Sequence, residues 1–422
     1  EIQECMKTMQ RAGLADAGVL LLPLHSLQEG DEQQATLHKP PPGMRKVILA
    51  TNIAESSITV ADVSVVIDFG LEKLPYFDMR ANSDSLLLRR CSRASAIQRA
   101  GRAGRVAPGV CLRLYPSKWL NDESIMSAFT PAEMQRTSLL NLVLKVKMID
   151  PGSPPAVLLS EAIQPPATAR VDAAVSQLIS LGALSGSLDA AVVTPLGRLI
   201  AAMPLSPPLG RLIVLGELLG CGRHAAIIAA SLSLPDPFLQ PYTRSDGGGG
   251  SCCNDEDEEA RLAEEDVAFH KPRLALFLAN GSSDPLSTLA LFEAWQDALS
   301  KGGPPRAAQY AHSQHASYKR LMEIEHLSRE LLQKIRQQRV EFGILLPPAG
   351  AAVTASGGPS ILMLQSLLTI AFSPNVAVGR TQCPPKVRED ILRHNIEPSR
   401  AIYCAVQTHA PGQPPPAASL TQ

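Results

Sequence analysis

Short apolar runs alternate with polar or amphipathic segments along the first part of the chain. These runs are too short for helices and rich in leucine, valine and isoleucine, so each predicts a buried strand. The predicted strands cover residues 19–24, 46–50, 63–67 and 110–115. Ile2, Met6 and Met9 recur at helical spacing and predict a helix that ends near Gly13. Strands that alternate with helices predict an α/β domain with a parallel sheet, whose functional loops lie at the carboxyl ends of its strands.

The remainder of the chain carries its apolar positions at helical spacing. Thr130 and Thr194 are each followed directly by proline, which predicts a helix with a threonine N-cap and proline in its first turn. A short strand at residues 192–193 lies among these helices, and this order is typical of a winged helix. Glu217 and Arg223 interrupt the most apolar stretch, so no membrane span is predicted. Further helices are predicted over residues 139–146, 171–179, 209–219, 225–234 and 321–335 and around Leu291.

Three segments have the composition of loops or linkers. Residues 245–265 hold a glycine run followed by acidic side chains, which predicts a mobile surface loop. Residues 347–359 are rich in proline, glycine and alanine and predict a flexible linker. The tail from Ala410 is rich in proline and alanine and is predicted to be disordered.

Composition and charge narrow the class of protein. The chain has 422 residues, of which 45% are hydrophobic, and its formal net charge is −1. This size fits about two to four domains with packed cores, and the charge excludes a uniformly basic coat but allows a local basic groove. The 8 cysteines include no C-x-x-C pair, so we expect no metal site and the reduced thiols of an intracellular protein. The first residues do not form a signal peptide, and the chain begins with Glu1 rather than an initiator methionine, so we expect a fragment.

The most concentrated chemistry lies in residues 95–105, S-A-I-Q-R-A-G-R-A-G-R. Arg99, Arg102 and Arg105 are three residues apart, so on a helix they would project from neighbouring faces of successive turns. Planar guanidinium groups suit phosphate oxygens, and the small residues between them let a polyanion come close. The alternative is a basic helix that is only solvated.

Polar residues follow the predicted strands at their carboxyl ends. Thr51 and Asn52 come directly after the second strand, and Asp68 ends the third. Side chains at such ends are binding candidates in a parallel sheet. Threonine and asparagine at these positions also cap the helix that follows, and the sequence leaves both interpretations open.

These segments together resemble the DEAH/DExH-box RNA helicases. Residues 50–59, A-T-N-I-A-E-S-S-I-T, resemble motif V of that family, and residues 98–105, Q-R-A-G-R-A-G-R, resemble its motif VI. Residues 22–26, L-P-L-H-S, resemble motif IV, and the three segments follow the order and spacing of the family. Residues 76–88 fall where the family carries a β-hairpin that separates nucleic-acid strands.

The resemblance implies roles for the arginine-rich run. Gln98, Arg102 and Arg105 match the γ-phosphate sensor and the arginine fingers of the family, and are therefore the implied catalytic and ATP-binding residues. Their task is to neutralise the charge that spreads over the transferring phosphoryl oxygens. Arg99 has an alternative role as a salt bridge that holds motif VI against its own domain.

Other residues are implied in binding rather than catalysis. Thr51 and Asn52 match positions that hold the nucleic-acid backbone, and Thr59 and Asp62 fall in the implied nucleotide-binding region. Leu37 stands where relatives commonly have a phenylalanine that stacks on the nucleobase. Many relatives also have an acidic residue for the ribose where this chain has an alanine beside Asp62. The phosphate contacts therefore match the family better than the base and ribose contacts do.

The resemblance also implies the order of domains. A second RecA-like domain without its first strand is expected over residues 1–117, and a winged helix over 118–203. A helical-bundle or ratchet domain is expected over 204–372 and part of an OB-like barrel over 373–422. The expected fold class is thus an α/β RecA-like sheet domain, followed by mainly helical domains and a truncated β remnant.

Two motifs of a complete nucleotide site do not occur in the 422 residues: the phosphate loop G-x-x-x-x-G-K-[ST] and the magnesium motif D-E-x-H. The expected cofactor is ATP with Mg²⁺, whose ligands would lie on a preceding RecA-like domain. We therefore expect this chain alone to be inactive. Its expected partners are RNA, that preceding domain and, as a candidate, a helicase-activating protein, with no membrane.

Three functions remain open at this point. The first is the C-terminal part of an ATP-dependent RNA helicase that couples ATP hydrolysis to RNA unwinding or translocation. The second is a truncated, non-catalytic module that binds RNA or protein. The third is a winged-helix nucleic-acid binder, which leaves the motif VI arginines without a purpose.

Overall fold

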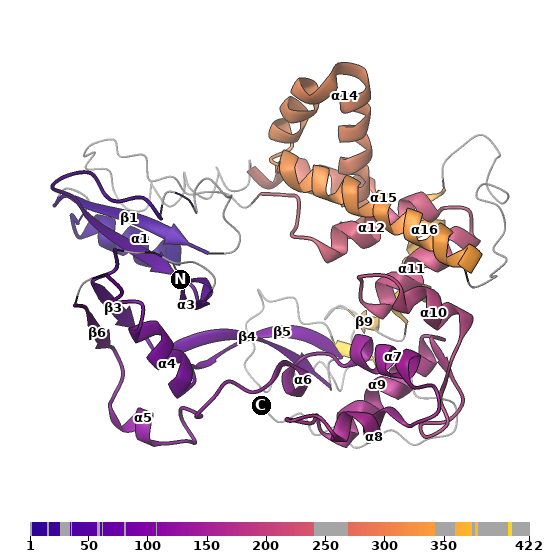
Figure 1. Ribbon diagram of the computed structural model, residues 1–422. Coiled ribbons are helices and arrows are strands. Elements are labelled where there is room, and N and C mark those ends of the chain that lie inside the picture. The colour runs from indigo at the N-terminus through magenta and orange to yellow at the C-terminus, as the bar shows by residue number, and fades with distance from the viewer. Residues whose placement is uncertain are drawn as a thin grey trace. The chain divides into compact units, whose positions relative to one another are not determined.

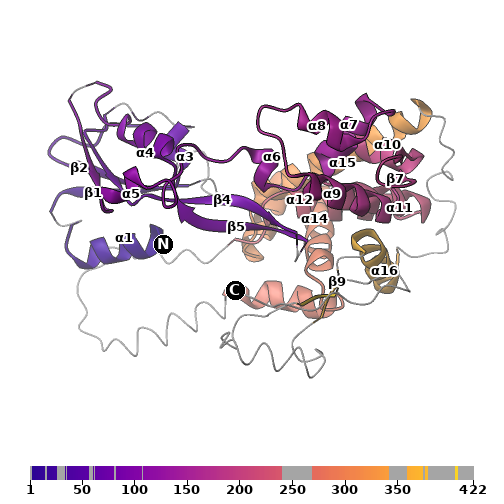
Figure 2. The same cartoon turned by 90° about the horizontal axis from the view of Figure 1, so that it is seen from below.

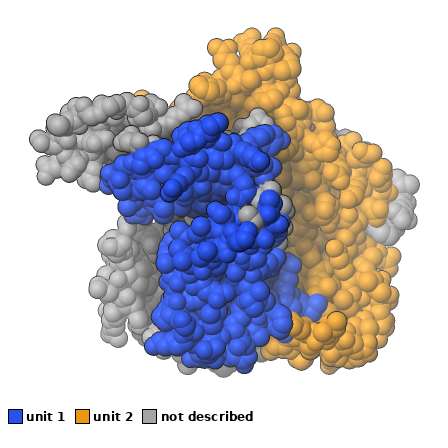
Figure 3. Space-filling view, turned by 60° about the vertical axis from the view of Figure 1, so that its left-hand side comes forward, with its two compact units in different colours: residues 1–78, 84–137, 244–247 blue, residues 79–83, 138–243, 248–422 orange. Residues whose placement is uncertain are grey.

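The computed structural model divides the chain into two compact units (Figure 3). The first comprises residues 1–78, 84–137 and 244–247, and the second comprises residues 79–83, 138–243 and 248–422. The segments 245–265 and 347–358 and the tail from Ala410 lie outside the described residues. The structure describes residues 2–14, 17–25, 34, 36–56, 60, 62–79, 82–106, 108–239, 269–341, 359–373, 376–378 and 404–406.

Two strand pairs of the first unit are parallel (Figure 1). Strand β1 pairs with β2 from Val19 opposite Arg45 to Leu24 opposite Ala50. Strand β3 pairs with β6 in the same parallel sense, and helix α1 packs against both β1 and β2. The prediction of parallel pairing is confirmed, although the described residues form separate two-stranded sheets rather than one continuous sheet. The elements of this unit are α1 Ile2–Arg11, β1 Val19–Leu24, β2 Arg45–Ala50, α3 Ile53–Ser56, β3 Val65–Asp68, β4 Leu71–Asp78, β5 Ser83–Arg90, α4 Arg93–Ala100, β6 Val110–Arg113, α5 Lys118–Asn121 and α6 Glu133–Arg136.

Strands β4 and β5 pair as a two-stranded ribbon (Figure 2). Asn82 adopts a positive φ of 48° directly before β5, a conformation that asparagine tolerates in turns. Every residue of β5 is exposed, whereas Glu72 near the start of β4 is buried. The ribbon occupies the segment predicted to carry a hairpin.

Helices with one small antiparallel strand pair begin the second unit. Thr194 is the N-cap of α10, because its hydroxyl accepts a hydrogen bond from the Gly197 N–H at 3.0 Å. The same hydroxyl donates to the Gly182 carbonyl at 2.6 Å and so joins the helix start to the segment before β7. The predicted cap with a following proline is confirmed here. The elements are α7 Leu140–Ile149, α8 Pro155–Ser160, α9 Thr168–Ser180, β7 Leu184–Ser185, β8 Val192–Val193 and α10 Pro195–Ala201.

A helical core completes the second unit. Helix α12 is central to it and packs against α11, α14 and α15, and its alanine-rich face lets these neighbours approach closely. Trp295, Leu212 and Leu291 are fully buried in this core. The remaining elements are α11 Pro207–Leu218, α12 Gly222–Ser233, a helical stretch over 269–279, α14 Asp284–Ser313, α15 Tyr318–Glu341, α16 Ile361–Phe372, β9 Val376–Val378 and β10 Cys404–Val406.

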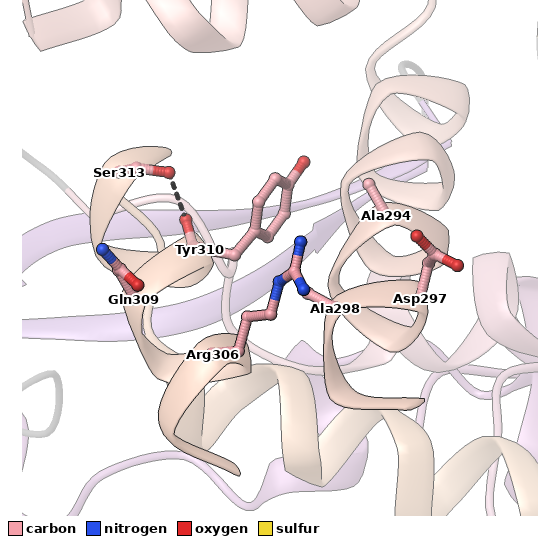
Figure 4. A pocket seen from close by; sticks show the side chains of 7 residues that line it. All are labelled: Ala294, Asp297, Ala298, Arg306, Gln309, Tyr310 and Ser313. Carbon is pink, nitrogen blue, oxygen red and sulfur yellow. Dashed lines mark hydrogen bonds between the residues drawn. The ribbon is translucent and has the colours of Figure 1, made fainter. Parts of the chain in front are cut away.

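Helix α14 bends back on itself at Gly303, which has a φ of +69° that side chains rarely adopt. Pro304 and Pro305 follow directly and begin the second arm. A depression of about 420 Å³ lies between the two arms, where Arg306 and Tyr310 face the first arm (Figure 4).

One predicted helix start is wrong. Thr130 does not cap a long helix. A single helical turn, α6, begins after Ala132 and ends at its C-cap Thr137, and α7 begins separately at Leu140. The Thr130 hydroxyl donates to the Ser92 hydroxyl at 3.2 Å, so tertiary contact has replaced the local cap. Among the helices that the structure describes, none has the length and apolar character needed to span a membrane.

Gly197 offers a test of this packing. A methyl group at this position would lie 2.1 Å from the Ala183 carbonyl oxygen, a backbone atom that cannot move aside cheaply. Alanine usually stabilises a helix relative to glycine by about 1 kcal/mol, but here we expect Gly197→Ala to destabilise the unit by about 1–3 kcal/mol. Urea unfolding followed by circular dichroism measures the change. Gly152→Ala, whose methyl group would meet only Asp150 Oδ1 at 3.5 Å, is the matched control and should leave stability nearly unchanged.

Candidate functional site

The arginine-rich run folds as a short helix followed by a turn. Ser92 caps α4, because its hydroxyl accepts a hydrogen bond from the Ser95 N–H at 3.1 Å. The helix ends at Ala100, and Gly101 and Gly104 carry the chain into a turn, Gly104 with a φ of +84°. The three arginines therefore do not share one helix, because two glycines follow its end.

Arg99 lies in the last turn of α4 and is almost entirely enclosed. Its Nε donates to Glu55 Oε2 at 3.0 Å, and its Nη1 donates to Asp68 Oδ1 at 3.0 Å and to the Leu71 carbonyl at 2.9 Å. Burial by itself lowers the pKa of Arg99, but the hydrogen bonds to the two carboxylates outweigh it and the net shift is upward. The side chain thus makes the salt bridges of the structural alternative and joins α4 to α3, β3 and the start of β4.

Asp68 is held from a second side. Its Oδ2 accepts a hydrogen bond from the Tyr115 hydroxyl at 3.1 Å, and its Oδ1 accepts one from the Gly70 N–H at 2.9 Å. Burial and the neighbouring Asp68 charge raise the pKa of the Tyr115 hydroxyl, so it remains a donor. Gly70 has a φ of +68°, and a methyl group there would lie 2.7 Å from the Tyr115 ring. Asp68 is therefore a structural anchor for Arg99 rather than an exposed binding residue.

Two more titratable groups border this network. Burial raises the pKa of the Glu72 carboxyl, and the charge of Glu55 adds to that shift while Arg99 opposes it. Burial also raises the pKa of the Cys91 thiol to about 11. Both side chains therefore favour their neutral forms more than they would in water.

Arg102 lies in the turn after α4, where it is partly exposed. Its Nη2 donates a hydrogen bond to the main-chain carbonyl of Glu55, and its own N–H donates to the Arg99 carbonyl at 3.0 Å. Desolvation and the charge of Arg105 lower the pKa of its guanidinium, while Glu55 raises it. Gln98 and Arg105 are both exposed on either side of it in the sequence. Two guanidinium groups therefore interact where an anionic ligand can reach them.

The polar residues after β2 serve the fold and face solvent at once. The Thr51 N–H donates to the Leu24 carbonyl at 3.1 Å, and the Thr51 hydroxyl accepts from the Ile53 N–H at 3.4 Å at the start of α3. The Asn52 carbonyl accepts from the Glu55 N–H at 3.0 Å. Both side chains are exposed, so the capping interpretation holds for Thr51 and leaves both residues available to a ligand.

Asp62 makes an ion pair that the sequence did not reveal. Lys46 Nζ donates to Asp62 Oδ1 at 3.0 Å and to the carbonyls of Thr36 and His38 at 2.9 and 2.8 Å. The two carbonyls flank Leu37, which is 46% exposed. Lys46 thus joins the segment that presents Leu37 to the segment that presents Asp62. Thr59 lies outside the described residues.

Two pairings were missed by reasoning from the sequence: Lys46 with Asp62, and Glu55 with the two arginines. Glu55 belongs to the motif V-like segment, and this was the one signal that could have drawn attention to it. Within the described ranges, no group of three or more His, Cys, Asp or Glu residues is arranged to hold a metal ion.

Comparison with known protein families matches two parts of the chain. Residues 2–107 match the helicase conserved C-terminal domain, and residues 206–287 match the helicase associated domain (HA2), described as ratchet-like. The first match includes all the candidate residues discussed above. The second includes α11 and α12 of the helical core.

Individual relatives extend these matches. The chain is 35% identical over 364 residues to the ATP-dependent RNA helicase TDRD9 of Mus musculus. The aligned region covers 84% of this chain and 24% of the relative. It is 41% identical over 231 residues to the DExH-box ATP-dependent RNA helicase DExH3 of Arabidopsis thaliana, covering 54% of this chain and 18% of the relative. It is 36% identical over 283 residues to the ATP-dependent DNA/RNA helicase DHX36 of Mus musculus, covering 67% and 25%. The chain thus spans a quarter or less of the length of these curated relatives.

Glu72 provides a pH test of the buried network. Its raised pKa means that the folded protein holds this proton more tightly than the unfolded chain does. The corresponding stabilisation is present below the ordinary carboxyl pKa and is lost as the pH rises through the raised value. We therefore expect the thermal midpoint of Glu72→Gln to rise relative to that of the native chain when the pH is raised from about 4 to about 8.

Thermal unfolding of both proteins at the two pH values measures this gain. Glu133→Gln, on the exposed side of α6, is the control and should show no such gain. An equal midpoint difference at both pH values for Glu72→Gln contradicts the prediction.

Proposed function

The chain belongs to the DEAH/DExH-box RNA helicase family. We propose that it forms the part of an ATP-dependent RNA helicase that supplies arginine fingers to the nucleotide and contacts the sugar-phosphate backbone of RNA. The observation that carries this proposal is the meeting of the two motifs at Glu55. Its carboxylate binds Arg99 and its carbonyl binds Arg102, so the motif VI turn is attached to the segment that begins with Thr51 and Asn52.

The positive charge of the motif VI turn supports a role at the nucleotide. Desolvation and then the charge of Arg105 lower the pKa of the Arg102 guanidinium, and a bound anion would offset that repulsion. Arg102 remains charged at neutral pH because guanidinium groups have very high pKa values. Gln98 adds an exposed amide that can orient a phosphate or a water. These residues fit the triphosphate of ATP. A Mg²⁺ ion bound with the ATP would be held by ligands on a separate RecA-like domain and would neutralise further phosphate charge.

The end of β2 supports a contact to the RNA backbone. Thr51 and Asn52 present a hydroxyl and an amide to solvent from backbone that is fixed by hydrogen bonds to Leu24 and within α3. Short polar side chains on fixed backbone position phosphates and sugars without reading base identity. We therefore propose binding that depends little on RNA sequence, with ATP hydrolysis coupled to unwinding or translocation in the complete protein. A helicase-activating protein remains a candidate partner.

The second unit supplies the proposed helicase accessory domains. Helices α7, α8, α9 and α10 with the antiparallel pair β7–β8 fit the part of the proposed winged helix (residues 118–203) that lies in this unit, from residue 138 onward. The core formed by α11, α12, α14, α15 and α16 fits a ratchet domain over residues 204–372. Strands β9 and β10 pair antiparallel and fit a remnant of an OB-like barrel over residues 373–422. In this arrangement the winged helix is a rigid hub rather than an independent reader of nucleic acid.

Arg102→Ala tests the arginine finger. In a form of the protein that also carries a nucleotide-binding RecA-like domain, we expect it to lower RNA-stimulated ATP hydrolysis by about a thousandfold or more, because such a finger stabilises transition-state charge. RNA affinity, measured by fluorescence anisotropy, should change little. Arg198→Ala, an exposed arginine of α10, is the control. Unchanged turnover in Arg102→Ala refutes the assignment, and RNA binding without any ATP hydrolysis in the parent protein favours a non-catalytic binding module.

Asn52→Ala tests the proposed RNA contact. We expect affinity for single-stranded RNA to fall roughly 2- to 10-fold, the value of one hydrogen bond, because the amide that bonds to the backbone is lost. The loss should be similar for oligouridine and for mixed-sequence RNA, since a backbone contact does not distinguish bases. Asn121→Ala, an exposed asparagine at the end of α5, is the matched control. A loss confined to one RNA sequence contradicts a backbone contact.

A further inference from the structure

Helix α3 is a single turn that connects two candidate sites. Two backbone hydrogen bonds tie its start to the end of β2: the Ala54 N–H donates to the Thr51 carbonyl at 3.3 Å, and the Glu55 N–H donates to the Asn52 carbonyl at 3.0 Å. A single helical turn is not stable on its own, because nucleating a helix costs more than one or two hydrogen bonds return. The position of this turn therefore depends on the side chains that anchor it.

Glu55 supplies that anchor with both its side chain and its main chain. Its side chain is 14% exposed, and Oε2 accepts from Arg99 Nε at 3.0 Å. Its carbonyl oxygen accepts from Arg102 Nη2. One residue therefore contacts both arginines, and it does so three residues after Asn52 and four after Thr51.

The other end of the connection is rigid. Arg99 is also bound to Asp68, which is 1% exposed in its side chain and is held by Tyr115 and Gly70. Arg99 therefore has little freedom to follow a displacement of α3. The Glu55 carbonyl has more, because its partner is the partly exposed Arg102 in a turn.

We propose that Glu55 is a positioning residue that links RNA bound at Thr51 and Asn52 to the placement of the Arg102 guanidinium. The link rests on the proposed function, and it identifies the route by which RNA regulates the finger. A phosphate bound at the start of α3 shifts the turn, and the Glu55 carbonyl carries the shift to Arg102. The hydrogen bond between the Glu55 carboxylate and Arg99 holds the Glu55 carbonyl in position next to Arg102.

The test observes Arg102 directly in this chain. The Nε–Hε signals of arginine side chains are recorded by ¹H–¹⁵N NMR, with assignments from single arginine-to-lysine variants. Glu55→Gln removes the carboxylate charge and keeps the carbonyl and the side-chain volume. Glu123→Gln is the matched control, because Glu123 binds Arg93 at 2.6 Å at the other end of the same helix α4. Arg99→Lys is a second variant that keeps the charge but loses the planar fork.

Without RNA, we expect Glu55→Gln to shift the Arg102 signal, Arg99→Lys to shift it in the same direction, and Glu123→Gln to leave it in place. An unchanged Arg102 signal in Glu55→Gln overturns the positioning role. This comparison needs no RNA and stands even if the proposed RNA contact fails.

With a single-stranded RNA of about ten nucleotides, within the range of site sizes of proteins that bind single strands, we expect the native Arg102 signal to move. The response should disappear in Glu55→Gln, while anisotropy shows nearly native RNA affinity. An equal response in both proteins overturns the link, as does a loss of affinity in Glu55→Gln that matches Asn52→Ala. Failure of the native chain to bind RNA contradicts the proposed RNA contact instead, and is recognised in the anisotropy measurement.

Discussion

The first unit depends on one enclosed guanidinium. Arg99 is 15% exposed in its side chain and is neutralised by Glu55 and Asp68, which are 14% and 1% exposed. An ion pair in such surroundings is costly to break, by about 3–5 kcal/mol, because removal of one partner leaves a charge without compensation. Four elements meet at this group: α3, β3, β4 and α4. The arginine that is least available to a ligand thus determines where the more exposed arginines lie.

Much of the local structure was predictable because its signals are local. The strands at Val19–Leu24 and Arg45–Ala50 follow from short apolar runs, and their parallel pairing follows from the alternation with helices. The start of α10 follows from Thr194 and the proline after it. The helices α11 and α12 follow from apolar positions on nearly every face. In each case the neighbouring residues contain the information.

The candidate site was less predictable because its contacts join distant parts of the sequence. Arg99 and Glu55 are 44 residues apart, and Lys46 and Asp62 are 16 apart, so no local pattern marks either pair. The end of α4 has a local signal by contrast, since Gly101 directly follows the helix and Gly104 adopts a positive φ. Thr130 differs again, because its hydroxyl makes a tertiary bond to Ser92 that competes with the predicted cap. Family resemblance supplied expected roles for single residues, but only the fold shows that Glu55 contacts two of the arginines.

The fit between Gly70 and Tyr115 has a consequence for how this family member can change during evolution. Any side chain at Gly70 would enter the Tyr115 ring, and loss of the ring would remove the hydroxyl that holds Asp68. A first substitution at either position therefore weakens the support of Arg99 before a second can restore it. The two positions are expected to vary together or not at all, so the path between alternative pairs passes through a less fit intermediate. The lack of space at a single glycine in this way restricts the sequences that are accessible around Arg99.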